Sequence, residues 1–191
     1  MAKELPIVPS SSSAPQSEGT QAEPYLYSRV FCTRENSPPL RLLLDFLKSK
    51  GQIPLIPKMD PAALDDWAWV RVSLGFSREN KPIQLFCLRD RGTHKDDLEK
   101  ERAEFLERLS VFDDEEAQLA RELVTRARFL VTTQIVKGEI TEAGYDFNGW
   151  ILEFFQDNCN GVVQVDGQGF FSPKGELIVP MEEIGSEIDH V

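Results

Sequence analysis

Four carboxylates near the C-terminal end of the chain have the residue type and spacing for acid–base or metal chemistry. Glu153 precedes Asp157 by one helical turn, and Asp166 and Glu176 follow within the next short segments. Paired carboxylates can hold a hard cation or divide the acid and base roles of a hydrolase. Asp166 precedes a glycine, however, which is typical of a turn, and Glu153 falls opposite an aromatic helix stripe. We therefore interpret these residues as turn and surface positions, and we predict no catalytic residue and no metal ligand.

The cysteines and histidines do not form a nucleophilic pair in the sequence. Cys32 and Cys87 lie inside apolar runs, and Cys159 lies near a predicted helix C-terminus, where the helix dipole opposes a thiolate. The chain has only two histidines, His94 and His190, and neither is close to a cysteine in sequence. Widely spaced cysteines without a CxxC motif are typical of buried apolar positions in a reduced cytoplasmic protein.

The bulk composition excludes several classes of protein. The chain has 191 residues, 41% of them hydrophobic and 9% aromatic, which is enough for a packed core. Its formal net charge of -11 disfavours nucleic acid and anionic membrane surfaces. We find no apolar run long enough to span a membrane and no secretory signal. The glycines of "DGQG" precede strands rather than a helix, so they do not form a phosphate-binding loop, and we predict no cofactor.

Composition and periodicity divide the chain into a central domain and two tails. Residues 1–24 are rich in Ser, Pro, Gln and Glu and predict a disordered tail, and residues 181–191 predict an acidic tail. Between them, residues 25–180 predict one α+β domain. Within it, residues 25–91 and 128–180 each read as strand, helix, strand and strand. Two helices in residues 93–127 join these parts.

Three local signals predict where helices begin and end. Ser37 followed by Pro38 suggests a helix N-cap and first turn. Asp146 is expected to cap the helix whose apolar stripe begins at Phe147. In the Asn-Gly step at its other end, Gly161 is expected to adopt the left-handed conformation that terminates a helix.

The predicted helix of residues 25–91 and the predicted helix of residues 128–180 also resemble one another in sequence. "LLLDFLKSKG" and "WILEFFQDNCNG" share an apolar triplet, an acid, an aromatic residue and a closing glycine. An internal duplication would explain the match, and so would chance or the shared demands of a helix that packs on a sheet. The element order resembles the duplicated strand-helix-strand-strand modules of GyrI-like ligand-binding domains and, less closely, a ferredoxin-like duplication.

The stretch "NGVVQVDGQGFFSPKGEL" is also similar to uncharacterised bacterial proteins. These resemblances imply a mostly antiparallel sheet with helices packed on one face. A GyrI-like fold would also imply an apolar ligand cleft between the two repeats.

Aromatic residues are the best candidates for a binding surface. In "DWAWVRVSLGF", alternation places Trp67, Trp69 and Arg71 on one side of a predicted strand, and the arginine indicates a half-exposed side. We add three aromatic residues from the C-terminal repeat as candidate ligand or partner contacts: Trp150, Phe170 and Phe171. The alternative is that these aromatic side chains form ordinary core.

These observations favour a non-enzymatic binding or regulatory module in the cytoplasm. We expect it to act through an unknown protein partner or as a homodimer, because an acidic surface with exposed tryptophans suits such contacts. The alternative is a sensor or carrier of an apolar small molecule, in which the aromatic residues line a cleft. A carboxylate-dependent hydrolase is the third hypothesis.

Overall fold

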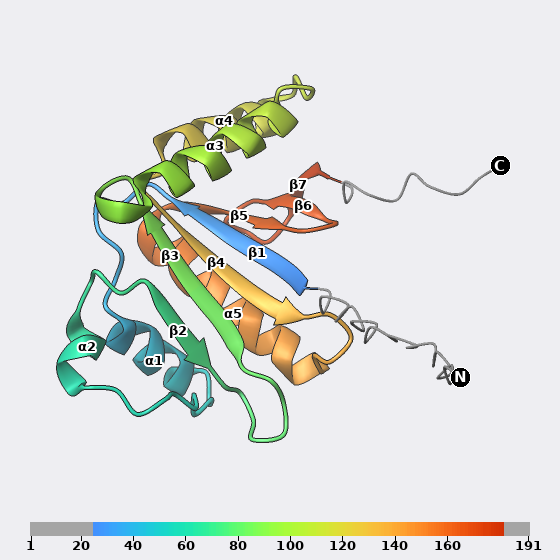
Figure 1. Cartoon of the computed structure of the whole chain (residues 1–191). Coiled ribbons are helices and arrows are strands. Elements are labelled where there is room, and N and C mark those ends of the chain that lie inside the picture. The colour runs from blue at the N-terminus through green and yellow to red at the C-terminus, as the bar shows by residue number, and fades with distance from the viewer. Residues whose placement is uncertain (1–24, 182–191) are drawn as a thin grey trace, which may run out of the picture.

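The computed structural model describes residues 25–181, so the two predicted tails lie outside the described residues except for Met181. Seven strands form one antiparallel sheet in the order β2-β3-β4-β1-β5-β6-β7 (Figure 1). The strands are β1 (Tyr25–Cys32), β2 (Arg71–Leu74), β3 (Ile83–Arg89), β4 (Phe129–Val136), β5 (Gly161–Val165), β6 (Gly169–Phe171) and β7 (Leu177–Pro180).

Five α-helices and a short 3-10 turn (Gly92–His94) complete the described fold. The helices are α1 (Leu40–Ser49), α2 (Pro61–Asp65), α3 (Lys95–Leu109), α4 (Glu115–Arg126) and α5 (Glu142–Cys159). Among residues 25–181, no helix combines the length and apolar character needed to cross a membrane. The predicted α+β class and the mostly antiparallel sheet are confirmed.

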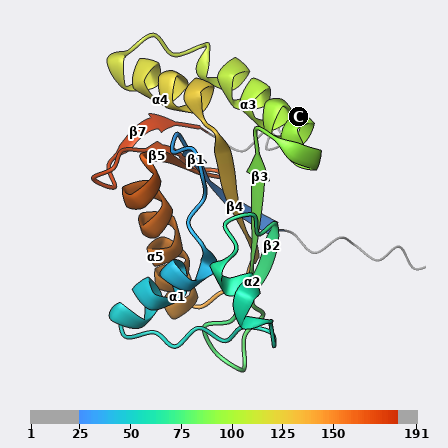
Figure 2. The same cartoon turned by 90° about the vertical axis from the view of Figure 1, so that its left-hand side faces the viewer.

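The helices cover both faces of the sheet, so the expectation of helices on one face needs correction. Helices α1 and α5 pack on the face that contains Val30 and Val131. Helices α3 and α4 pack on the opposite face, against Phe31 and Leu130. Figure 1 shows α5 behind the sheet and α3 and α4 across its upper end, and the turned view separates the α1–α5 layer from the α3–α4 pair (Figure 2).

The physical reason is that neighbouring residues of the central strands are buried on both sides. Val30, Phe31 and Cys32 are consecutive and all fully buried. Because successive side chains of a strand point to opposite faces, such a run requires apolar cover on each face. An alternating strand would have required only one.

The helix boundaries differ from the predicted ones at each of the three sites. Helix α1 begins at Leu40, and the hydroxyl of Ser37 donates instead to the carbonyl of Trp67 at 2.6 Å. Helix α5 begins at Glu142, five residues earlier than expected, because Thr141 caps it. At its end Asn160, not Gly161, is left-handed, with φ of 49°.

Gly161 has a different role. A Cβ atom there would lie 2.7 Å from Val30 Cγ1 and 3.2 Å from the Phe31 carbonyl oxygen. The glycine therefore allows the start of β5 to approach β1 closely.

The two proposed repeats differ in the way their strands join the sheet. Strand β1 lies between β4 and β5, the first strand of the second hairpin. Strand β4 lies between β1 and β3, the second strand of the first hairpin. The internal duplication therefore stays a prediction.

Candidate functional site

Three loops meet at the end of the sheet where β1 and β3 finish, and hydrogen bonds hold them together. The Arg89 guanidinium donates to the Ser37 hydroxyl at 2.9 Å and to the carbonyls of Trp67 and Trp69 at 2.7 and 2.6 Å. Arg91 donates to the carbonyl of Glu35 at 3.1 Å. We call the group formed by Ser37, Trp67, Arg89 and Arg91 the Trp67 platform. Its backbone is fixed by contacts that cross between all three loops.

The two tryptophans of this region have opposite environments. Trp69 is 6% exposed, its indole N–H donates to the Pro38 carbonyl at 3.0 Å, and its ring lies 6.1 Å from that of Phe155. Trp67 is 42% exposed. Trp69 is thus a core residue, whereas Trp67 presents apolar surface to the outside.

Two guanidinium groups lie over the Trp67 ring. The Cζ atoms of Arg89 and Arg91 are 5.9 and 5.2 Å from the ring centroid, within the range of cation–π contacts. Arg89 is buried, and its Nε has no hydrogen-bond partner among the described residues. Neither arginine forms an ion pair with a carboxylate of residues 25–181. The platform therefore carries two positive charges whose described partners are carbonyl, hydroxyl and amide oxygens and the Trp67 ring.

The other predicted contact residues do not gather around Trp67. Arg71 is exposed on the opposite sheet face from Trp69, with its guanidinium 5.1 Å from the Phe86 ring. Trp150 is partly buried against the α1–α5 core. Phe170 is fully buried on the α3–α4 face, whereas Phe171 is partly buried on the α1–α5 face. The structure brings Trp67 and Trp69 near each other and disperses the rest.

Arg71 does not share a strand face with the tryptophans because strand β2 is shorter than predicted. The regular strand covers only Arg71–Leu74, and Trp67 lies in a turn before it. Alternation of residue types therefore predicts Arg71 as a neighbour of Trp67. The observed neighbours are Ser37, Arg89 and Arg91, which come from the loop after β1, the end of β3 and the loop after β3.

The four carboxylates considered for catalysis do not gather in one cluster, although Glu153 and Asp157 lie one turn apart on α5 beside the same groove. Asp166 pairs with Arg29 at 2.6 Å on the α3–α4 face of the sheet. Glu153 lies on α5, on the other face, and pairs with Lys50 at 2.8 Å. Within residues 25–181, no three His, Cys, Asp or Glu side chains are grouped so that they could hold a metal ion. This arrangement gives no support to the hydrolase hypothesis.

All three cysteines are free, buried and part of the α1–α5 core. Burial raises the pKa of the Cys87 thiol to about 11. Burial, together with the adjacent thiol of Cys159, also raises the pKa of Cys32. A raised pKa opposes the thiolate that nucleophilic catalysis needs, so Cys32 and Cys87 have the character of small apolar core residues.

The raised pKa of Cys87 predicts a loss of stability at alkaline pH. An unfolded thiol titrates near pH ~8.5. Above that pH the unfolded chain loses the proton while the folded chain keeps it, so the free energy of unfolding falls by up to ~1.4 kcal/mol per pH unit until about pH 11. Urea unfolding between pH 7.5 and 10 should show a shallower fall for Cys87→Ala than for the wild type. Equal slopes would contradict the assignment.

A groove of about 470 Å³ lies between α5 on one side and β5, β6 and the β6–β7 turn on the other. Apolar side chains of Leu152, Val163, Val165 and Phe171 line it, and Asp157 and Lys174 are among its polar residues. Gln156 joins its two walls, because its side-chain amide donates to the Ser172 carbonyl at 3.0 Å. The volume falls within the range of small-molecule sites.

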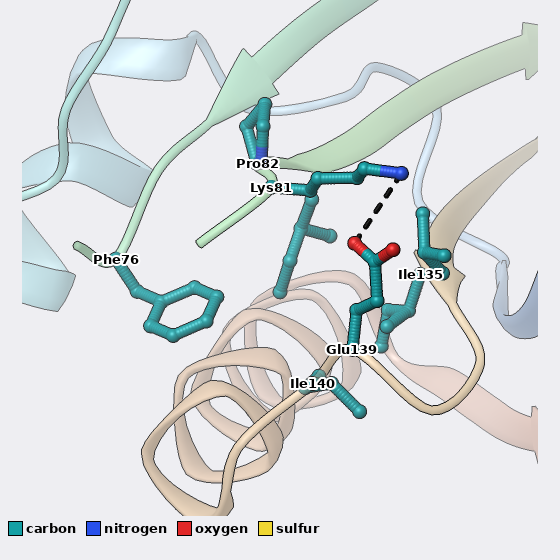
Figure 3. Close-up of a pocket in the computed structure, with 8 residues that line it drawn as sticks. Phe76, Lys81, Pro82, Ile135, Glu139 and Ile140 are labelled. Carbon is teal, nitrogen blue, oxygen red and sulfur yellow. Dashed lines mark ion pairs between the residues drawn. The ribbon is translucent and has the colours of Figure 1, made fainter. Parts of the chain in front are cut away.

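A second cavity lies at the opposite end of α5, beside Phe76 and Ile140. Figure 3 shows the Lys81 ammonium and the Glu139 carboxylate facing each other there, 3.3 Å apart. Its volume of about 10 Å³ has room for about one water molecule. We interpret it as a packing feature.

The glycines of α5 distinguish internal packing from open space. A Cβ atom at Gly144 would lie 2.6 Å from Ile140 Cγ1 and 2.7 Å from Phe76 Cζ. A Cβ atom at Gly149, which lines the groove, would meet no atom within 4 Å. The fold itself therefore requires Gly144 and does not require Gly149.

This contrast predicts opposite effects of the same substitution. Gly149→Ala should raise the free energy of unfolding by about 0.5–1 kcal/mol, because alanine is the better helix former. Gly144→Ala should lower it, because the new methyl group overlaps two side chains. Thermal or urea unfolding of both variants checks the pair. A loss of stability in Gly149→Ala would show that the space beside it is not open.

Sequence reasoning did not identify Ser37, Arg89 and Arg91 as partners of Trp67. Arginine at the end of a predicted strand reads as a solvated charge, and Ser37 reads as a helix cap. No local pattern indicates that three separate loops meet.

No family model, curated protein or solved structure matches this chain.

Proposed function

We propose that the protein is a non-enzymatic binding module that recognises a protein partner through the Trp67 platform. The observation that carries this proposal is the exposure of Trp67, at 42%, on a backbone fixed by hydrogen bonds from Arg89 and Ser37. Tryptophan and arginine, together with tyrosine, are enriched among the energetic centres of protein interfaces. A rigid platform also loses little conformational entropy when it binds.

The chemistry of the platform favours a partner segment that carries carboxylates. One nitrogen of Arg91 bonds to Glu35 and Asn36, and its other N–H groups have no partner among the described residues. A guanidinium with free donors binds carboxylates in a bidentate manner. The buried charge of Arg89 adds to the local positive potential. An acidic segment with an apolar residue against Trp67 would satisfy both features.

Native mass spectrometry of the protein isolated gently from its own host tests the proposal. We expect a complex with a second protein, or a homodimer, that is lost in Trp67→Ala and kept in Tyr145→Ala. Tyr145 is a matched control because it is an aromatic residue with 51% exposure in the first turn of α5. The platform lies near the other end of that helix, where Thr33 and Arg34 bond to Cys159. A bare monomer, or equal loss in both variants, would contradict the proposal.

The groove beside α5 favours a second function, the binding of an apolar small molecule. This second function would be supported if native mass spectrometry shows a small-mass adduct that is lost when the protein is denatured. We also propose a cytoplasmic location, because three free buried thiols suit a reducing compartment.

A further inference from the structure

We propose that the groove beside α5 is a binding site for a small zwitterion with a large apolar side chain, of the free amino-acid type. The inference rests on the second function proposed above and narrows its ligand class from a wholly apolar molecule to one that also carries two opposite charges. The site is separate from the Trp67 platform, so its failure would not affect the partner proposed for that platform. Three features of the groove lead to this ligand class.

The first feature is the space above Gly149. A glycine inside a helix destabilises the helix relative to alanine. No atom of the described chain lies within 4 Å of the position that a Cβ would take at Gly149, so internal packing does not account for the glycine. A ligand that approaches the helix backbone closely would account for it.

The second feature is the apolar floor. Leu152 and Val163 are 7% and 6% exposed, and Val165 and Phe171 are partly buried beside them. These side chains come from both the helix and the sheet. Gln156 bonds to the Phe171 and Ser172 carbonyls at 3.4 and 3.0 Å and so fixes the distance between the two walls. A preformed apolar floor of this kind suits a large aliphatic or aromatic side chain.

The third feature is a pair of opposite charges on the two walls. Asp157 lies in the last turn of α5, and Lys174 lies in the turn between β6 and β7. Neither forms an ion pair with another residue of 25–181, nor do they pair with each other. Glu153, the other acid of the groove, is already neutralised by Lys50 at 2.8 Å.

The position of Asp157 is unfavourable for the helix itself. A carboxylate near a helix C-terminus faces the negative end of the helix dipole, which is an unfavourable interaction. An ammonium group bound at Asp157 would offset that repulsion. A carboxylate of the same ligand would then meet Lys174, while the apolar side chain lies on the floor.

Isothermal titration calorimetry of the full chain tests this assignment with L-phenylalanine and L-leucine as probes. We expect saturable binding of at least one. We expect roughly three- to tenfold weaker binding of the matched analogues that lack one charge, 3-phenylpropionate and phenethylamine, because each loses an ion pair of about 1 kcal/mol. Absence of saturable binding at 10 mM, or equal affinity for the zwitterion and both analogues, would overturn the proposal.

Two variants locate the site. Gly149→Leu should fill the groove and abolish binding while the thermal midpoint stays at or above that of the wild type. Lys174→Met, at an exposed turn position, should weaken L-phenylalanine binding and leave phenethylamine binding unchanged. Unchanged binding of L-phenylalanine in either variant would overturn the assignment to this groove. Trp67→Ala serves as the control and should bind the probes like the wild type.

Discussion

Replacement of Arg89 by methionine is expected to lower the free energy of unfolding by about 2–4 kcal/mol. The substitution keeps much of the apolar stem but leaves the carbonyls of Trp67 and Trp69 and the Ser37 hydroxyl without the donor that they share. Hydrogen bonds to a charged group contribute about 1.5–3 kcal/mol each, and unsatisfied buried acceptors add to the cost. Urea unfolding, with the m-value compared to that of the wild type, gives the number.

A matched substitution separates this effect from the general loss of an arginine. Arg126 is exposed at the end of α4 and pairs with Glu122 at 2.8 Å within one helix. Because surface pairs of this kind contribute little, Arg126→Met should unfold almost like the wild type. Arg89→Met should also shift the tryptophan fluorescence to longer wavelength in the native state, since the turn that holds Trp67 is released. A stable variant with unchanged emission would show that Arg89 does not hold the platform.

Truncation of Phe105 to alanine should destabilise the protein by about 3–5 kcal/mol, the range for a fully buried phenylalanine. Phe105 is the aromatic residue through which α3 meets the sheet. Its ring packs edge-on against Phe31 at 5.4 Å and against Phe170 at 5.9 Å. All three rings are fully buried. Removal of the Phe105 ring should therefore leave a cavity in the packed core that the surrounding side chains fill only in part.

The same measurement on Val111→Ala provides the control, because Val111 is 77% exposed in the loop between α3 and α4. Its expected change is within about 0.5 kcal/mol. A loss below 1 kcal/mol for Phe105→Ala would mean that α3 contributes little to the folded state. The packing of α3 and α4 on the sheet would then contribute little to the free energy of unfolding.

The sequence predicted the class of fold because periodicity is a local property. The α1 stripe of Leu40, Leu43, Leu44 and Leu47 is buried as its spacing requires, and the strand runs at β1 and β4 pair as antiparallel neighbours. The sequence also contains a signal that helices pack on both faces of the sheet. Consecutive apolar residues such as Val30, Phe31 and Cys32 indicate a strand buried on each side.

The candidate site was less predictable, because its residues are brought together only by the tertiary fold. Trp67 could be singled out, since a tryptophan beside polar residues is unusual. Its partners could not, because Ser37, Arg89 and Arg91 lie 22 or more positions away in sequence. Trp69 shares the same local pattern and is buried, which shows that alternation does not distinguish exposure near the end of a strand.

The groove beside α5 illustrates the same limit from another direction. Gly149 has no local signature, since a glycine inside a helical pattern reads only as a weak point. The role of Gly149 depends on the residues across the groove, which belong to β5 and to the β6–β7 hairpin. Gly144 differs from Gly149 only in its surroundings, because the side chains of Ile140 and Phe76 lie against Gly144.

Hydrogen exchange of the complex isolated from the host is the most direct test of the central claim that a partner binds at the Trp67 platform. We expect slower exchange than in the free protein for amides in residues 33–37, 66–70 and 89–94, and unchanged exchange in α3 and α4. Protection confined to α3 and α4 would place the partner elsewhere. That result would contradict the role assigned to Trp67.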